Sequence, residues 1–223
     1  MLSFFKEYKK FAIVFAVLSL IIILIIYNVL NVEPPLPVYQ PTMVSEELVD
    51  VSIQDQRKYH TIANFKLVNQ NGDTITQEIY KDKIYVADFF FTTCPTICPV
   101  MTKNMADIQD IIKNDDDIML LSHSVTPEID SVPQLKKYAL EKGVIDSKWN
   151  LVTGDKKQIY ELARKSYLAV KTVGDGGPYD MIHTENFMLI DKKQQIRGFY
   201  DGTNEEEIQR LLNDLKRLKK EEQ

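Results

Sequence analysis

The segment that most constrains the fold joins a buried strand to a helix through two cysteines. Residues Lys83 to Phe91 (KIYVADFFF) are mostly apolar, β-branched or aromatic, which is typical of a central strand buried on both faces. Apolar residues then recur at spacings of four, three and four, as on one face of an α-helix. These residues are Met101, Met105, Ile108 and Ile112. We therefore expect Cys94 and Cys98 where a strand ends and a helix begins.

The alternation of strand and helix continues to the C-terminus. After a hairpin signal at Asn71-Gly72, strand patterns cover 118–125, 149–152, 187–190 and 196–200, and helix patterns cover 131–142, 155–167 and 205–220. Strands alternating with helices predict an α/β fold, in which helices flank both faces of a central sheet. With the cysteine pair at the first strand–helix junction, we expect a thioredoxin-like fold with a mixed sheet.

The N-terminal region carries a long apolar run. Residues 11–26 contain no charge, three lysines precede them, and no Lys or Arg follows until Arg57. About 20 apolar residues cross a hydrocarbon core as a helix, and cytoplasmic flanks are enriched in Lys and Arg. We expect a transmembrane anchor over 11–30, with 1–10 cytoplasmic and the rest extracytoplasmic. A cleaved signal peptide is the rival interpretation, but no Ala-x-Ala site follows the run.

Four prolines follow the apolar run, at Pro34, Pro35, Pro37 and Pro41. Closely spaced prolines favour an extended spacer, so we expect a stalk over 31–47 and a domain over 48–223. The formal net charge is −5 and the domain has no basic block, which argues against nucleic acid as a partner. The first ten residues lack the arginines of a transit peptide, which favours a bacterial inner membrane over a mitochondrion.

The cysteine pair is the candidate working site. Two cysteines four residues apart cannot form a disulfide framework, but they can cycle between thiol and disulfide or hold a soft metal. A helix N-terminus favours the thiolate that either role needs. Structural zinc sites usually need four ligands. Thioredoxin-type redox motifs have two residues between their cysteines, where this chain has three. A peroxiredoxin needs Thr three residues before its cysteine, where Phe91 and Pro95 stand.

A third ligand must come from elsewhere, and the chain has three histidines. We expect His123 to be packed or hydrogen-bonded within its strand and His60 to be solvated. His183 precedes the strand at 187–190, and in a thioredoxin-like sheet the loop entering that strand faces the cysteine junction. Position alone leaves open whether His183 is a ligand or a structural residue. Thioredoxin-like oxidoreductases keep a proline just before this strand, and 182–187 contain none.

Taken together, these residues resemble the Sco/SenC family of copper-delivery proteins, which assist assembly of the copper A centre of cytochrome c oxidase. The resemblance covers residues 60 to 215 approximately and includes the anchor. Its marks are Phe91 to Pro99, Ser124 to Glu128, Trp149 to Gly154, and His183-Thr184. It implies that Cys94, Cys98 and His183 bind copper, a set that suits Cu(I) and can also hold Cu(II). Thr96 and Ile182 stand where family members often carry acidic residues, which lowers the negative charge near the metal.

Two functions follow from the resemblance. The first is a membrane-anchored copper metallochaperone, which would pass copper to the copper-bearing subunit of cytochrome c oxidase. The alternative is a thiol–disulfide oxidoreductase, in which Cys94 and Cys98 form a redox-active pair that reduces the cysteines of the copper acceptor. The second function would make the chain an enzyme, and the first would not.

Overall fold

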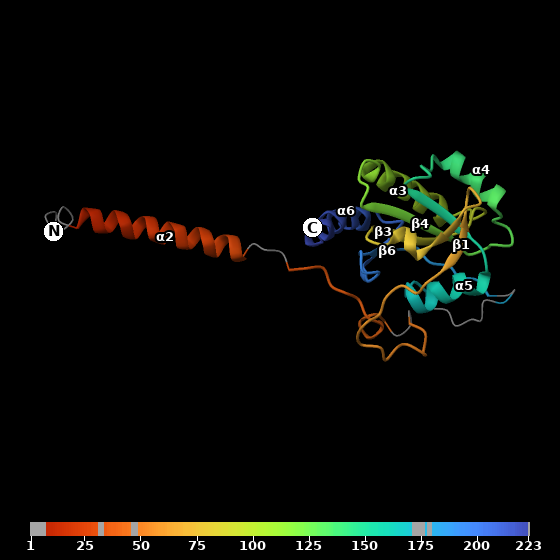
Figure 1. Cartoon of the computed structure of the whole chain (residues 1–223), viewed down its shortest axis with the longest axis horizontal. Coiled ribbons are helices and arrows are strands. Elements are labelled where there is room, and N and C mark those ends of the chain that lie inside the picture. The colour runs from red at the N-terminus through yellow and green to blue at the C-terminus, as the bar shows by residue number, and fades with distance from the viewer. Residues whose placement is uncertain (1–7, 31–33, 46–48, 171–176, 178–179, 223) are drawn as a thin grey trace. The chain divides into compact units, whose positions relative to one another are not determined.

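The computed structural model describes residues 8–30, 34–45, 49–170, 177 and 180–222 (Figure 1). The chain divides into two compact units, Met1–Pro35 and Leu36–Gln223. Every strand that the structure describes belongs to the second unit.

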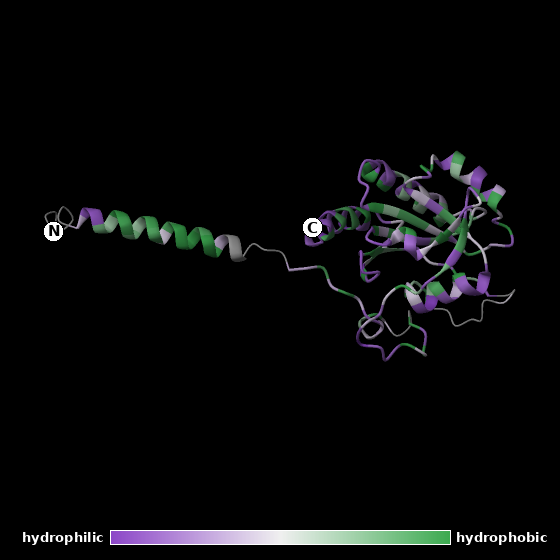
Figure 2. Cartoon of the chain, viewed as in Figure 1, coloured by the Kyte–Doolittle hydropathy of each residue, from purple (hydrophilic) through white to green (hydrophobic). Residues whose placement is uncertain are grey.

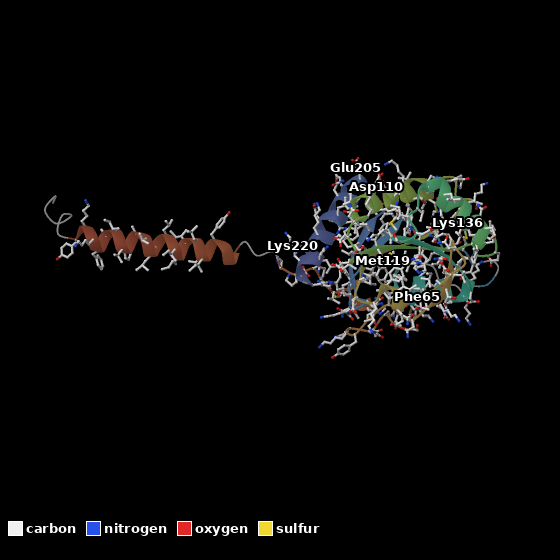
Figure 3. All side chains as sticks on the ribbon, turned by 45° about the horizontal axis from the view of Figure 1, so that its top comes forward. Phe65, Asp110, Met119, Lys136, Glu205 and Lys220 are labelled. Atoms are coloured by element: carbon white, nitrogen blue, oxygen red, sulfur yellow. The ribbon has the colours of Figure 1, made fainter. Side chains whose placement is uncertain are left out.

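The first unit contains one long helix, α2, at Lys9–Leu30. At 1.5 Å per residue, its 22 residues span roughly 33 Å, close to the thickness of a hydrocarbon core. The helix is hydrophobic along most of its length (Figure 2), and its apolar side chains project outward all round (Figure 3). By length and composition, Lys9–Tyr27 can cross a membrane, and a signal sequence would pass the same test.

The second unit is built on a seven-stranded mixed sheet with the order β2-β1-β5-β4-β3-β6-β7. The strands are β1 Lys66–Asn69, β2 Thr74–Thr76, β3 Ile84–Phe90, β4 Ile118–Ser124, β5 Trp149–Thr153, β6 Asn186–Ile190 and β7 Ile196–Asp201. The three central strands β3, β4 and β5 run parallel. Strands β1 and β6 pair antiparallel with β5 and β3, and the edge strands β2 and β7 pair antiparallel with β1 and β6. All seven residues of β3 are buried, which confirms a central strand covered on both faces.

Helices cover both faces of the sheet (Figure 1). They are α3 Ile97–Ile112, α4 Val132–Lys142, α5 Lys156–Glu161 and α6 Glu205–Glu221, with 3-10 turns at Pro41–Met43 and Gln77–Tyr80. Helices α3, α4 and α6 enclose one apolar core against the sheet, and α5 helps enclose a second core on the opposite face. This arrangement confirms the expected α/β fold of thioredoxin-like type.

One expected helix is shorter than its sequence pattern. Helix α5 begins after Asp155, whose side chain accepts a hydrogen bond from the backbone N–H of Gln158. The α-helix ends at Glu161, and the chain continues as a π-helical turn over Leu162–Ser166. Its wider winding is closed by a 2.8 Å bond from the N–H of Tyr167 to the carbonyl of Leu162, five residues earlier.

The proline-rich spacer also differs from expectation. Leu36 is buried, and the Arg197 side chain donates to the carbonyl oxygens of Leu36 (2.7 Å) and Pro37 (3.1 Å). The N–H of Tyr39 donates to the carbonyl of Ile196 on the edge strand β7 (2.8 Å). Residues 36–43 are therefore part of the folded unit, and a free stalk over the whole of 31–47 is wrong. Their extended form suits a sheet edge, whose unpaired backbone groups they satisfy.

Candidate metal and thiol site

The candidate site lies at one edge of the sheet. Strands β3 and β4 are parallel, so both end at this edge, at Phe90 and Ser124. Strand β6 is antiparallel to β3 and therefore starts here, at Asn186. The loop leaving β3 carries Cys94, and the loop entering β6 carries His183. The fold thus brings both loops to the same edge, as the sequence pattern predicted, and ligand sites of α/β sheets commonly lie at such strand ends.

The two cysteines occupy the turn between β3 and α3. Cys94 lies in the loop, and Cys98 is the second residue of α3. The N–H of Cys98 lies 3.5 Å from Cys94 Sγ, and the hydroxyl of Thr96 lies 3.8 Å from it. Both thiols are free, with 7% and 3% of the residues exposed. A sulfur atom faces the positive end of a helix here, which is the arrangement that stabilises a thiolate.

The two thiols differ in acidity. Burial opposes ionisation of Cys94, but hydrogen bonds from Cys98 and Thr96 outweigh it and lower the pKa of the Cys94 thiol from 9.0 to about 7. Burial raises the pKa of the Cys98 thiol to about 12, and the neighbouring Cys94 and Asp88 charges add to this effect. Near neutral pH, Cys94 is therefore the thiolate of the pair, and Cys98 keeps its proton until a metal or a disulfide replaces it.

A buried carboxylate holds the cysteine loop in place. Asp130 is fully buried and accepts hydrogen bonds from the hydroxyl of Thr92 (2.5 Å) and its N–H (3.2 Å). The same carboxylate accepts hydrogen bonds from the hydroxyls of Ser124 (2.6 Å) and Thr126 (3.1 Å). Asp130 thus joins the start of the cysteine loop to the end of β4, which fixes the position at which the loop leaves the sheet.

A second carboxyl group, that of Asp88, lies inside the strand that leads to the cysteines. Asp88 is 2% exposed, and within the described part of the chain its Oδ1 atom has no hydrogen-bond partner. Burial raises the pKa of Asp88 to about 7, against a smaller opposing effect from a hydrogen bond with Ser122. Val86 and Phe90, its neighbours on the same face of β3, belong to the core that contains both cysteines. A charge on Asp88 therefore acts on the buried thiol of Cys98.

His183 reaches the expected edge but does not join the thiols. Its side chain is exposed, and its ring lies edge-on to Phe91 with 6.1 Å between ring centroids. Among the described residues, no group of three His, Cys, Asp or Glu side chains lies close enough together to hold a metal. The structure therefore brings Cys94 and Cys98 together and leaves His183 on a neighbouring loop. The glycine-rich segment 174–178 lies outside the described residues, except for Gly177.

The other two histidines are structural. His123 is fully buried, stacks on Phe89 at 4.8 Å, and lies 3.3 Å from the carbonyl of Asp88 through Nδ1, as expected of a packed strand residue. His60 was expected in solvent, and this is wrong. It is 4% exposed, and its Nε2 lies 2.8 Å from the carbonyl of Ser166. Burial lowers the pKa of His60, which keeps the ring neutral in the core.

Sequence reasoning missed both carboxyl groups of the site. Asp88 did give a signal, because it is the one charged residue between Ile84 and Phe91 in an otherwise apolar strand. Asp130 gave none, since its partners lie at the ends of two strands and only the fold brings them together.

Comparison with known proteins identifies the family of the chain. The family model described as SCO1/SenC matches residues 53–220. This chain belongs to the SCO1/SenC family. A curated relative, the SCO1 protein homolog of Bacillus subtilis, is 33% identical over 166 residues, which cover 74% of this chain and 85% of the relative.

Two solved Sco structures extend the comparison. BsSco, described as a member of the Sco family of cytochrome c oxidase assembly proteins with a disulfide switch, is 31% identical with a TM-score of 0.61. That match covers 74% of this chain and 96% of BsSco. ScoI of Bradyrhizobium japonicum, solved with copper bound, is 26% identical with a TM-score of 0.56, covering 72% of this chain and 99% of ScoI.

Proposed function

We propose that this Sco/SenC chain is a copper metallochaperone, which binds copper through Cys94, Cys98 and His183 and delivers it to the copper A site of cytochrome c oxidase. Copper is the metal, in line with the copper-bound Sco relative. One observation of the site carries the proposal: two free thiols, one with a pKa of about 7, sit at a helix N-terminus beside a loop that presents an exposed imidazole. Thiolates and imidazole together suit Cu(I), a soft ion, and also bind Cu(II).

In the proposed site the imidazole of His183 would turn from its edge-on position against Phe91 towards the two thiols. The imidazole is exposed and free to reorient, whereas both thiols are held by the start of α3. The metal would therefore meet the thiol pair first, and His183 would complete a three-coordinate site from the opposite loop. Transfer to the oxidase would proceed through ligands shared with the acceptor, so the acceptor docks over the Cys94 and His183 loops.

The membrane anchor belongs to the same proposal. Helix α2 would hold the chain in a bacterial inner membrane, with the N-terminus cytoplasmic and the copper-binding domain on the extracytoplasmic side. This orientation is supported by the three lysines before the apolar run, because no further Lys or Arg occurs after it until Arg57. Labelling of single engineered cysteines with a membrane-impermeant maleimide in intact cells tests it, in a chain whose Cys94 and Cys98 are both replaced by serine. The reagent should reach residue 73, which lies in an exposed turn, and not residue 6.

The test of the copper proposal is a Cu(I) titration of the reduced full-length chain in detergent, without oxygen. We expect uptake of about one equivalent with high affinity, loss of binding in Cys94→Ser and Cys98→Ser, and a clearly weaker affinity in His183→Ala. Glu185→Ala is the matched control, because Glu185 is exposed on the same loop two residues away. Failure of the wild-type chain to bind copper would refute the metallochaperone.

A thiol–disulfide oxidoreductase remains the alternative, favoured by the low pKa of Cys94 and by the disulfide switch described for BsSco. In this role Cys94 attacks the disulfide of the acceptor and Cys98 resolves the mixed disulfide, so that the acceptor is reduced and the pair is oxidised. His183→Ala separates the two functions. It should weaken copper binding and leave the rate of disulfide exchange nearly unchanged, and a variant that retains full copper affinity would remove His183 from the ligand set.

A further inference from the structure

The segment that carries His183 is tied down by a buried ion pair. Arg164 donates to both carboxylate oxygens of Asp180, at 2.7 Å through Nη1 and 2.6 Å through Nη2. Only 5% and 7% of the two side chains are exposed. Two parallel bonds between planar groups fix orientation as well as distance. Asp180 lies three residues before His183, so this pair fixes the N-terminal side of the histidine loop.

The π-helical turn places Arg164 for this contact. Arg164 is the third residue of that turn, and its guanidinium lies 5.4 Å from the ring centroid of Tyr160. The hydroxyl of Tyr160 lies 2.9 Å from the carbonyl of Val125, just beyond β4, and 3.2 Å from the carbonyl of Asp180. Asp180 is therefore connected to both the π turn and the edge of the sheet where the cysteine loop emerges. Such turns are frequent at functional sites.

The pair also sets which side chains face outward. From Met181 to Glu185 the residues alternate between exposed and buried, with Ile182 1% and Thr184 6% exposed. In an extended segment a shift by one residue exchanges the two faces, which would bury the imidazole of His183. The C-terminal side is held separately, since the amide of Asn186 donates to the carbonyl of Ala169 at 3.3 Å. An anchor on each side leaves the loop a single register.

We infer that Arg164 and Asp180 are positioning residues, which fix the register of the loop so that the imidazole of His183 can reach the metal held by the two cysteines. The inference rests on the proposed function. Neither side chain touches the copper, and both act through His183. Partners that orient a ligand from outside the coordination sphere typically change metal affinity by about 10- to 100-fold.

The test combines Asp180→Asn with His183→Ala in full-length chain in detergent, with Cu(I) affinity measured by competition against a chromophoric chelator. Asp180→Asn keeps the shape of the side chain and should weaken copper binding about 10- to 100-fold. In the His183→Ala background the same substitution should cause no further loss, because its effect passes through the imidazole. Glu141→Gln, which removes the carboxylate charge from the exposed Lys137–Glu141 pair, is the matched control and should leave the copper affinity unchanged.

Two further measurements distinguish a loss of His183 positioning from a general disturbance of the fold. The alkylation rate of Cys94 should be unchanged in Asp180→Asn, since the cysteine loop has its own anchor at Asp130. Tyr160→Phe removes only the hydroxyl between Val125 and Asp180 and should weaken copper binding several-fold, even if Asp180→Asn folds poorly.

The possible results are distinct. Wild-type affinity in Asp180→Asn or Tyr160→Phe, together with a clear loss in His183→Ala, would overturn the inference and leave the proposed ligands standing. An equal loss from Asp180→Asn with and without His183 would also overturn it. Unchanged affinity in His183→Ala alone would instead refute the ligand assignment on which the inference depends.

Discussion

At the scale of single residues, two cysteines four positions apart have opposite properties. Cys94 faces N–H groups at the start of α3, which stabilise its thiolate, whereas Cys98 lies deeper among apolar side chains. A nucleophile or first metal ligand must be ionised and reachable, and a resolving thiol or second ligand need not be. In the proposed function, Cys94 would therefore act before Cys98.

This difference predicts selective alkylation. In the native reduced chain, iodoacetamide should modify Cys94 with a rate that rises to half its maximum near pH 7, and should leave Cys98 largely unmodified below pH 9. Peptide mapping by mass spectrometry measures both rates. In urea the two cysteines should react alike, which is the control. Faster modification of Cys98 in the folded chain would contradict the assigned order.

Asp88 predicts an unusual dependence of stability on pH. Its pKa is raised from 3.8 in the unfolded chain to about 7 in the fold, so the folded state holds the proton more tightly. The free energy of unfolding should therefore fall as the pH rises from about 4 to about 7 and then level off. Asp88→Asn removes this penalty and should stabilise the domain more at pH 8 than at pH 5, by on the order of 2 kcal/mol.

Urea denaturation at the two pH values measures the effect of Asp88→Asn. Asp107→Asn, at an exposed position on α3, is the control and should show no such difference. If Asp88→Asn stabilised the chain equally at both pH values, the carboxyl would not be protonated in the fold.

Which residues form the site, and which are buried near it, was partly predictable from the sequence. The position of Cys94 and Cys98 follows from local patterns, because strand and helix periodicities meet within ten residues. The role of Asp130 and the burial of His60 do not follow, since both depend on distant partners. His60, for example, meets Ser166 across 106 residues of chain. The polar residues around His60 in the sequence indicated a solvent-exposed ring, whereas the contact with Ser166 buries it.

At the scale of elements, the site depends on how loops are fastened to strand ends. Asp130 fastens the cysteine loop to β4, and the Arg164–Asp180 pair fastens the histidine loop to the π turn. Periodicity indicated the strands and helices themselves, including the hairpin β6–β7 and helix α6. The π turn was not predicted, because Leu162 to Ser166 continues the helical pattern of α5 and only the backbone bonds distinguish the two.

The Asp130 anchor predicts a large loss of stability on truncation. Asp130→Ala removes the acceptor of hydrogen bonds from the buried Ser124 and the half-buried Thr92 and Thr126, and leaves these donors without that partner. We expect the free energy of unfolding to fall by about 2–4 kcal/mol, as measured by urea denaturation. Asp107→Ala at the exposed pair with Lys103 should stay within about 0.5 kcal/mol of wild type. A similarly small change for Asp130→Ala would mean that the loop does not depend on this carboxylate.

The segment before the domain gives a further prediction. Arg197 holds residues 36 and 37 through their carbonyl oxygens and also pairs with Asp191 and Glu221. Arg197→Ala should free this segment, so that limited proteolysis cuts within 34–45 faster than in wild type while the rest of the domain stays intact. Lys216→Ala, at an exposed position on α6, is the control. Unchanged cleavage would show that other contacts hold the segment.

At the scale of the whole molecule, an apolar helix and a compact α/β domain occur in one chain. The order of strand and helix patterns predicted the mixed sheet and the edge at which both candidate loops emerge. It did not predict where the folded unit begins, because prolines indicate an extended backbone in a free spacer and at a sheet edge alike. Membership of the SCO1/SenC family indicates copper as the metal. The central prediction is that Cys94, Cys98 and His183 are its ligands.

X-ray absorption at the copper edge tests that prediction most directly. The full-length reduced chain is loaded with one equivalent of Cu(I), and its spectrum is compared with that of His183→Ala. We predict two sulfur scatterers and one nitrogen scatterer in the wild type, with the nitrogen lost or replaced in the variant. A wild-type spectrum with sulfur alone, or one unchanged in His183→Ala, would contradict copper binding by Cys94, Cys98 and His183.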